Sequence, residues 1–196
     1  MSTVSKAEAT RKARIAVAAR LEFARHGYAG ARLQRIADRA GVNKQLVFYY
    51  FGSKTGLYRA VIEQSAGRLF TASVEPDTRA TVHLSQEVRS AFAALGENPQ
   101  LVRLLVNDAC EEGAARDLAS SILSELHSRL HAIILKGQGL GYFRDNVDPD
   151  VAARQAINLI MGQLCLESAR QSAPESGRGR SPTDSICDLL LRYLAW

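Results

Sequence analysis

Residues 33–53 read LQRIADRAGVNKQLVFYYFGS, a pattern of two short helices separated by a tight turn. Apolar residues of the first half recur at helical spacing and stop at Gly41, which predicts a short amphipathic helix ending there. Asn43 can cap the next helix, because an Asn side-chain oxygen accepts a free backbone N–H of the first turn. Gly52 is expected to end that helix, and Ser53 can cap a further one. Two helices joined in this way form the arrangement that places a recognition helix in the DNA major groove.

Packing between the two helices can be predicted from their apolar residues. Ile36, Ala37 and Val47 are expected to hold the pair together. Phe48 and Phe51 are interpreted as core residues rather than DNA contacts. A helix pair around a glycine turn also occurs in proteins that do not bind DNA, so this pattern alone leaves the function open.

The charge of the chain is unevenly distributed. Residues 1–59 hold 12 Lys and Arg against 3 Asp and Glu, a net charge of +9, whereas residues 60–196 hold 13 against 17, a net charge of −4. Such asymmetry favours a nucleic-acid or anionic-membrane surface at the N-terminus, with a solvated basic face as the alternative. A membrane is the weaker candidate, because the apolar face of the helix expected over residues 9–26 is rich in alanine.

Polar and aromatic residues near the start of the second helix are candidate DNA contacts. Lys44 and Gln45 stand in its first turn, where Lys can donate to guanine O6 and N7 and Gln can pair with adenine. Tyr49 can stack on a sugar or a thymine methyl group. Tyr50 and Lys54 are expected to point toward the DNA backbone, where Lys54 would hold a phosphate together with the N-terminal N–H groups of its own helix.

The rest of the chain also has helical periodicity, and no convincing alternating run of strand type occurs, so an all-α fold is predicted. The helix over residues 9–26 should end at Gly27. Three further helix starts are marked by a capping residue before proline: Asn98-Pro99, Asp148-Pro149 and Ser181-Pro182, the last resembling a capping box with Asp184. Glycines 137, 139 and 141 are expected to interrupt a long helix, and residues 171–180 read as a flexible loop.

Two apolar stripes lie near the C-terminus. The first comprises Ile157, Ile160, Met161, Leu164 and Cys165, and the second Ile186, Leu189, Leu190, Tyr193 and Leu194. One such stripe could face its own core, but two suit a four-helix bundle built across the two-fold axis of a homodimer. A dimer would recognise two half-sites of a palindromic operator in double-stranded DNA.

A small-molecule site between the C-terminal helices would be mostly apolar with a few placed polar groups. The candidates for contact with this unidentified effector are Arg103, Asn107, His127, His131, Asn158 and Gln163. No nucleophile with a base, phosphate loop or metal-ligand pattern stands out, so we predict no enzymatic activity, cofactor or metal. Helix capping explains Asp148 better than a calcium loop does.

Composition sets broad limits on the class of protein. Of the 196 residues, 46% are hydrophobic and 23% charged, values ordinary for a globular protein. No run of eighteen apolar residues occurs, and residues 1–14 are polar and basic, so a cytoplasmic protein without a membrane partner is expected. Cys110, Cys165 and Cys187 are far apart and are interpreted as reduced, mostly buried thiols.

Residues 11–62 closely resemble the N-terminal domain of the TetR family of bacterial regulators. The resemblance is carried by Gly27-Tyr28, Ile36-Ala37, Ala40-Gly41-Val42-Asn43, Phe48-Tyr49-Tyr50-Phe51, Ser53-Lys54 and Leu57. It implies a homodimer, usually a repressor, with a DNA-binding domain over residues 1–52 and a ligand-binding and dimerisation domain over residues 53–196, about nine helices in all. Members of this family typically leave their operator when a small molecule binds. By position, Lys44, Gln45 and Tyr49 match base contacts, and Tyr50 and Lys54 match phosphate contacts.

The sequence departs from the family pattern at two places. Many relatives open the second helix with Thr-Ser, where this chain has Ala31-Arg32. A hydroxyl cap is therefore absent, and Arg32 is expected to contact phosphate by charge instead. The triplet Lys44-Gln45-Leu46 replaces small or hydroxyl residues, which should alter the operator sequence rather than abolish binding.

Overall fold

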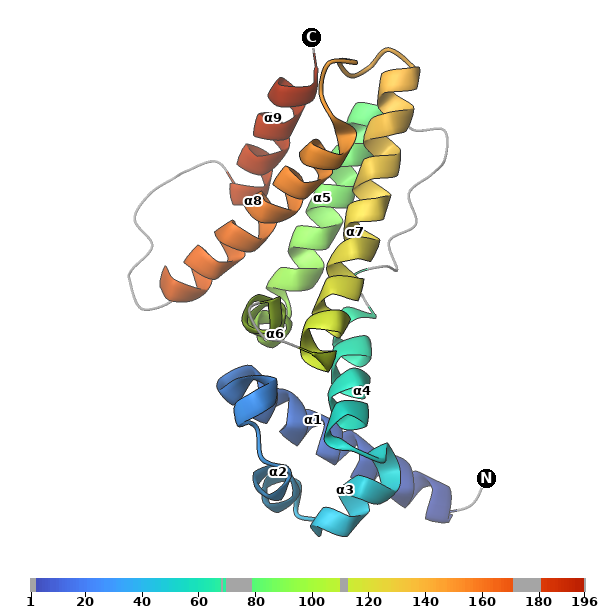
Figure 1. Ribbon diagram of the computed structural model, residues 1–196, viewed down its shortest axis with the longest axis vertical. Helices are drawn as coiled ribbons and strands as arrows, with labels where there is room; N and C mark the ends of the chain where they lie inside the picture. Colours follow the sequence, from blue (N-terminus) through green and yellow to red (C-terminus); the bar gives the residue numbers. More distant parts are fainter. Residues whose placement is uncertain (1–2, 68, 70–78, 110–112, 171–180, 196) are drawn as a thin grey trace. The chain divides into compact units, whose positions relative to one another are not determined.

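The computed structural model describes residues 3–67, 69, 79–109, 113–170 and 181–195. Within these ranges the chain forms nine α-helices and no strand (Figure 1), which confirms the predicted all-α class. The helices are α1 Thr3–Gly30, α2 Leu33–Ala40, α3 Lys44–Phe51, α4 Lys54–Ala66, α5 Ala80–Gly96, α6 Pro99–Ala109, α7 Ala114–Gly139, α8 Pro149–Arg170 and α9 Pro182–Leu194. The predicted loop over residues 171–180 lies outside the described residues.

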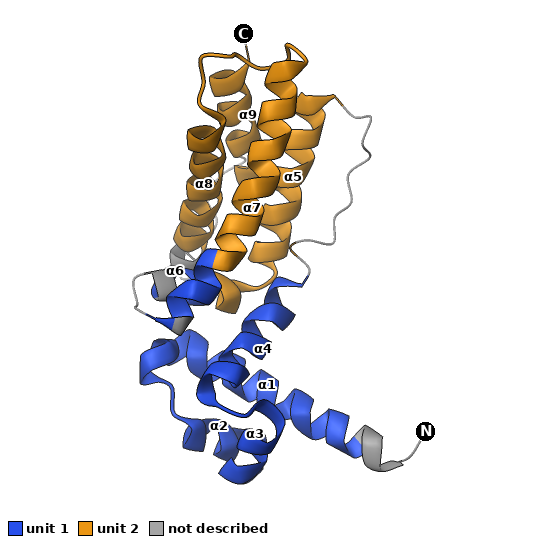
Figure 2. Ribbon diagram, turned by 45° about the vertical axis from the view of Figure 1, so that its right-hand side comes forward, with its two compact units in different colours: residues 1–67, 103–120 blue, residues 68–102, 121–196 orange. Residues whose placement is uncertain are grey.

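The chain divides into two compact units (Figure 2). The first contains residues 1–67 and 103–120, and the second residues 68–102 and 121–196. Helices α6 and α7 therefore contribute residues to both units. The functional boundary at residue 52 stays a prediction.

Helix α1 is the scaffold of the first unit, since both α2 and α4 pack against it. Its regular helix breaks at Gly27 (φ 66°, ψ 176°), the residue expected to end it. Just before the break, the buried ring of Phe23 meets Tyr58 of α4 edge-on, with 4.9 Å between the ring centroids. Tyr28 contacts the same Tyr58 ring at 5.1 Å. These aromatic contacts fix α4 across α1.

The helix ends between α2 and α4 follow the sequence signals. Gly41 adopts the left-handed conformation (φ 63°) that a side chain would disfavour, and it ends α2. Asn43 Oδ1 accepts the N–H of Leu46 at 2.8 Å, and Ser53 Oγ accepts the N–H of Gly56 at 2.9 Å. Both predicted caps are confirmed.

Two predicted caps in the rest of the chain are also confirmed. At the start of α6, Asn98 Oδ1 accepts the N–H of Leu101 at 3.3 Å. At the start of α8, Asp148 Oδ1 accepts the N–H of Asp150 at 2.8 Å, so Asp148 has the capping role expected of it.

The predicted capping box of α9 is wrong. Ser181 occupies the N-cap position with proline after it, but its side chain makes no capping hydrogen bond. Asp184 instead pairs with Arg89 of α5. An aspartate is too short for the reciprocal bond, and the ion pair to a neighbouring helix takes its carboxylate.

Helix α7 is not interrupted at Gly137, contrary to expectation. The helix continues to Gly139, and a Cβ on Gly137 would lie 2.2 Å from the ring of Phe143. Gly137 therefore permits the buried ring of Phe143 to approach the helix. The chain turns at Gly141, whose φ is 74°.

The second unit buries three of the five members of each C-terminal stripe. Helices α5, α8 and α9 pack against one another. The buried members of the stripes are Ile157, Ile160, Leu164, Ile186, Leu190 and Leu194, and Cys187, which lies outside the stripes, is buried as expected. Cys165 is exposed, so the expectation of buried thiols is wrong for this residue, and Cys110 lies outside the described residues. No described helix is both long enough and apolar enough to span a bilayer.

Candidate DNA-binding surface

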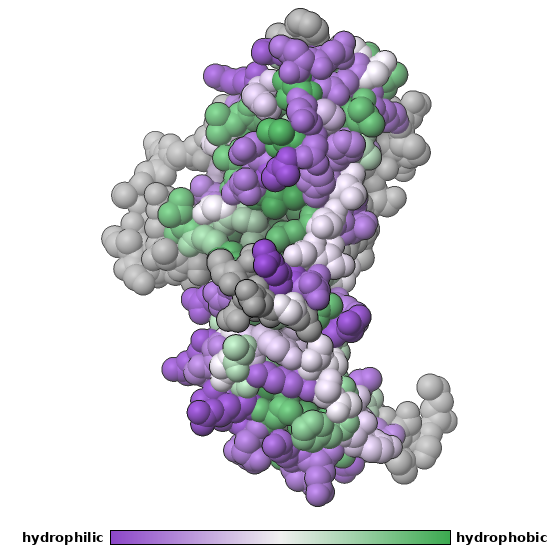
Figure 3. Space-filling view, viewed as in Figure 1, coloured by the Kyte–Doolittle hydropathy of each residue, from purple (hydrophilic) through white to green (hydrophobic). Residues whose placement is uncertain are grey.

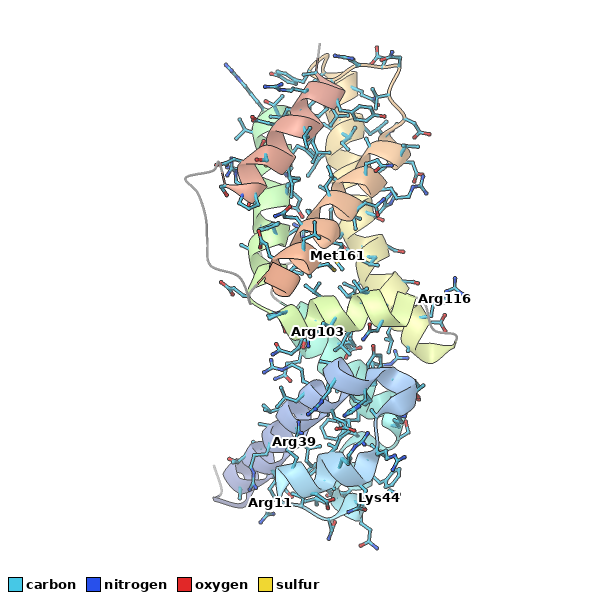
Figure 4. The ribbon with its side chains drawn as sticks, turned by 90° about the vertical axis from the view of Figure 1, so that its left-hand side faces the viewer. Arg11, Arg39, Lys44, Arg103, Arg116 and Met161 are labelled. Atoms are coloured by element: carbon cyan, nitrogen blue, oxygen red, sulfur yellow. The ribbon has the colours of Figure 1, made fainter. Side chains whose placement is uncertain are left out.

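Helix α3 is held by its apolar side and presents its polar side to solvent. Val47 is 1% exposed and anchors the helix. Lys44, Gln45 and Tyr49 are exposed, Tyr49 to 74%, and Tyr50 is half-buried with its ring 5.2 Å from that of Tyr49. Figure 4 shows Lys44 on α3, with Arg11 and Arg39 in the same lower part of the view. The three predicted base contacts therefore share an accessible face.

Phe48 is 42% exposed, so its interpretation as a core residue is wrong. The ammonium of Lys44 lies 5.8 Å from the centroid of the Phe48 ring. A cation over an aromatic face is favourable by about 0.5–1 kcal/mol at an exposed site. Phe48 thus lies on the exposed side of α3 beside Lys44, while the half-buried Phe51 lies under the ammonium of Lys12 at 5.7 Å.

Lys54 stands in the first turn of α4 and faces the end of α1. Its ammonium donates to Ala29 O at 3.1 Å and lies 4.9 Å from the centroid of the Tyr28 ring. Burial lowers the pKa of Lys54, and the negative charge of Glu22 opposes that shift. One of three ammonium donors is used within the protein, which leaves donors for a phosphate.

The N-terminus of α2 has no side-chain cap of its own. Arg32 is the N-cap residue and is exposed, and its side chain makes no capping bond, as the missing hydroxyl predicts. Its backbone N–H donates instead to Glu22 Oε1 of α1 at 3.2 Å. A carboxylate ten residues earlier in the chain therefore supplies the cap.

Glu22 is a buried carboxylate that sequence reasoning missed. It is 3% exposed, and its Oε1 accepts a hydrogen bond from Arg35 Nε at 2.6 Å. His26 Nε2 lies 3.8 Å from its Oε2. Burial alone would raise the pKa of Glu22, but the bonds from Arg32 N–H and Arg35 and the charges of Arg35 and His26 hold it below its ordinary value. The available signal was an acidic residue within a strongly basic segment.

The junction between α3 and α4 depends on a second missed residue, Gly56. A Cβ at this position would lie 2.1 Å from the carbonyl oxygen of Phe51. Backbone atoms would have to move to relieve this overlap. The neighbouring Thr55 joins Tyr28 through a hydroxyl–hydroxyl bond of 2.7 Å. Close backbone approach, which a sequence pattern does not record, explains this glycine.

The six predicted effector contacts are divided between the two compact units. Arg103 and Asn107 belong to the first unit and are exposed. Asn158 of the second unit is also exposed. Gln163 Nε2 donates a hydrogen bond to Glu167 Oε1 of the same helix at 3.2 Å. The rings of His127 and His131 stack, with 6.1 Å between their centroids. His127 Nε2 lies 3.1 Å from Asp150 Oδ1 of α8.

The geometry of α2, α3 and the start of α4 defines a helix-turn-helix DNA-binding protein. The model of the family described as bacterial regulatory proteins, tetR family, matches residues 15–61. The transcriptional repressor SCO4008 of Streptomyces coelicolor is 37% identical over 146 residues, which are 74% of this chain and 73% of that relative. The repressor NicS of Pseudomonas putida is 26% identical over 153 residues, 73% of this chain and 68% of NicS.

A solved structure extends the likeness to the whole fold. FadR of Bacillus subtilis, in complex with stearoyl-CoA, superposes with a TM-score of 0.67 at 18% identity, covering 91% of this chain and 96% of FadR. The chain belongs to the TetR family, and it is a non-enzymatic, DNA-binding transcriptional regulator.

Proposed function

We propose that the protein is a homodimeric repressor that binds a palindromic operator in double-stranded DNA and leaves it when a small-molecule effector binds. The observation that carries the proposal is the exposed face of α3, held in place by Val47 and by caps on either side. Since DNA is its partner, the protein acts in the cytoplasm.

The exposed residues divide into two roles. Lys44 and Gln45 read base edges from the first turn of α3, and Tyr49 contacts a base or sugar one turn later. Arg32, Tyr50 and Lys54 hold the DNA backbone, where contacts fix register without reading sequence. The positive end of the α4 dipole beside Lys54 supports its role at a phosphate.

Dimerisation is proposed through the apolar residues of α8 and α9 that the second unit leaves exposed. Leu166 is 56% exposed, Leu189 57% and Tyr193 45%. Hydrophobic side chains reach the surface of this unit among polar ones (Figure 3). Burying them against a second copy would complete a four-helix bundle and align two copies of α3 with two half-sites.

The effector site is proposed within the ligand-binding and dimerisation domain, with Arg103, Asn107, His127, His131, Asn158 and Gln163 as candidate contacts. FadR of Bacillus subtilis holds stearoyl-CoA, which makes acyl-CoA molecules the first class to screen. His127 and His131 are the first pair to substitute, since their rings stack on each other.

The proposed function is tested by selecting genomic DNA fragments with the purified protein and measuring affinity against salt. Enrichment of one palindrome, with affinity that falls steeply as salt rises and no binding to anionic vesicles, is expected. Enrichment of a single asymmetric half-site would contradict the dimeric proposal.

A charge-introducing variant tests the dimer directly. Leu189→Glu combined with Tyr193→Glu should yield a monomer in sedimentation and lower operator affinity by about 100-fold, because the two half-sites no longer act together. Leu135→Glu on α7 is the matched control, since Leu135 is similarly exposed (53%). A double variant that remains dimeric would show that another surface forms the interface.

A further inference from the structure

Glu22 is surrounded by positive groups from three helices. Arg35 of α2 lies 2.6 Å from its Oε1, and His26 of α1 lies 3.8 Å from its Oε2. Arg35 also donates to Gly30 O at 3.0 Å, across the break in α1. The backbone N–H of Arg32 donates to Glu22 Oε1 at 3.2 Å. The negative charge of Glu22 also acts electrostatically on Lys54 of α4.

A buried carboxylate is a costly way to fill a core position. Removing its hydration costs several kcal/mol, which paired charges offset only with good geometry, and apolar residues of similar size often stabilise a protein equally well. Packing alone therefore does not explain Glu22. Its two strongest contacts lie at the first turn of α2, next to the exposed side chain of Arg32.

We infer that Glu22 is a positioning residue for DNA binding: its buried negative charge holds the N-terminus of α2 on α1 and compensates Lys54, so that Arg32 and Lys54 meet the DNA backbone in fixed places. This inference rests on the proposed phosphate contacts of Arg32 and Lys54. Because Glu22 is buried, it acts through Arg32 and Lys54 rather than by contact with DNA.

The effect on Lys54 has a definite sign. Burial lowers the pKa of Lys54, and Glu22 raises it. Without the carboxylate, the pKa of Lys54 falls further, so the ammonium loses its proton at a lower pH. DNA affinity should then decline earlier as pH rises from about 7 toward about 10.

The experiment measures affinity for a short duplex of mixed sequence across this pH range, using the full-length protein. Glu22→Gln keeps the size of the side chain and one acceptor for Arg32 N–H but removes the charge; Glu63→Gln on the exposed face of α4 is the control. Glu22→Gln should lower the affinity for DNA by about tenfold at neutral pH, and this loss should grow as pH rises. Glu63→Gln should lower the affinity by less than about twofold. Lys54→Arg added to Glu22→Gln should remove the growth with pH, because arginine stays charged.

A second variant keeps the inference testable if Glu22→Gln fails to fold. Arg35→Gln leaves the carboxylate without its main partner, so the pKa of Lys54, followed by NMR of its side chain, should rise; in Glu22→Gln it should fall. Opposite shifts support an electrostatic role, whereas equal shifts, or affinity of Glu22→Gln equal to that of Glu63→Gln, overturn it. If Lys54→Gln also leaves DNA affinity unchanged, the proposed phosphate contact is wrong as well.

Discussion

The segment from Gly41 to Ser53 and the helices of the second unit are specified in different ways. In the segment, each helix end is set by a glycine or a capping side chain within three residues. In the second unit, α5 and α9 begin without side-chain caps, and α9 is held by long-range contacts such as Arg89 with Asp184. The helix ends on either side of α3 are thus encoded locally, whereas the starts of α5 and α9 depend on packing between distant residues.

The largest effect is expected at the junction between α3 and α4, where the backbone is most closely packed. Gly56→Ala should destabilise the first unit by about 1–3 kcal/mol and weaken DNA binding, because its methyl group would collide with the backbone oxygen of Phe51. Gly139→Ala at the end of α7 meets nothing within 4 Å and should be neutral or stabilising by up to about 1 kcal/mol. Chemical denaturation of both variants tests this contrast. Equal free energies of unfolding for Gly56→Ala and Gly139→Ala would contradict it.

A smaller contrast is expected between two N-cap positions. Asn43→Ala should cost about 1 kcal/mol in the free energy of unfolding, since it removes the bond to Leu46 N–H. Ser181→Ala should change it very little, because the Ser181 side chain makes no capping bond. Denaturant titration distinguishes the two; a Ser181 variant as unstable as the Asn43 variant would contradict the difference in encoding.

What the sequence predicted follows the same division. Gly41, Asn43 and Ser53 could be assigned because each acts on residues next to it in the chain, and the burial of Val47 follows from helical periodicity. Glu22 could not be assigned, since its partners on α2 and α4 are brought to it by folding. Phe48 was misassigned because apolar character does not reveal which side of a short helix faces solvent.

The C-terminal stripes illustrate a further limit. Periodicity identified the apolar positions of α8 and α9 correctly, but it could not show which of them the second unit buries itself. Ile160 is fully buried, whereas Leu189 is 57% exposed. In each helix, spacing of three and four residues places the buried and the exposed apolar residues on one broad face.

The smallest contrast lies in pH dependence. The pKa of Glu22 is lowered from 4.5, so its contribution to stability is complete above that value and is lost as pH falls through the folded-state pKa. The pKa of His83 in α5 is lowered from 6.5, chiefly by burial, so the neutral ring is favoured and stability is lost as pH falls below 6.5.

The contribution of His83 to stability should therefore be lost at a higher pH than that of Glu22. Thermal unfolding followed by methyl NMR signals of each unit tests this order. His83→Gln should remove the loss of stability that begins below pH 6.5 in the second unit. Glu22→Gln should remove the loss of stability that begins below pH 4.5 in the first unit. The same pH window for both units would contradict these assignments.

The central claim is that α3 reads sequence while the start of α4 holds the backbone. The most direct test compares Lys44→Ala with Lys54→Ala on the selected operator and on an unrelated duplex at one salt concentration. Lys44→Ala should lower the ratio of the two affinities, and Lys54→Ala should weaken both DNAs by a similar factor and reduce the salt slope by about one. The reverse pattern would contradict the division of roles between the two lysines.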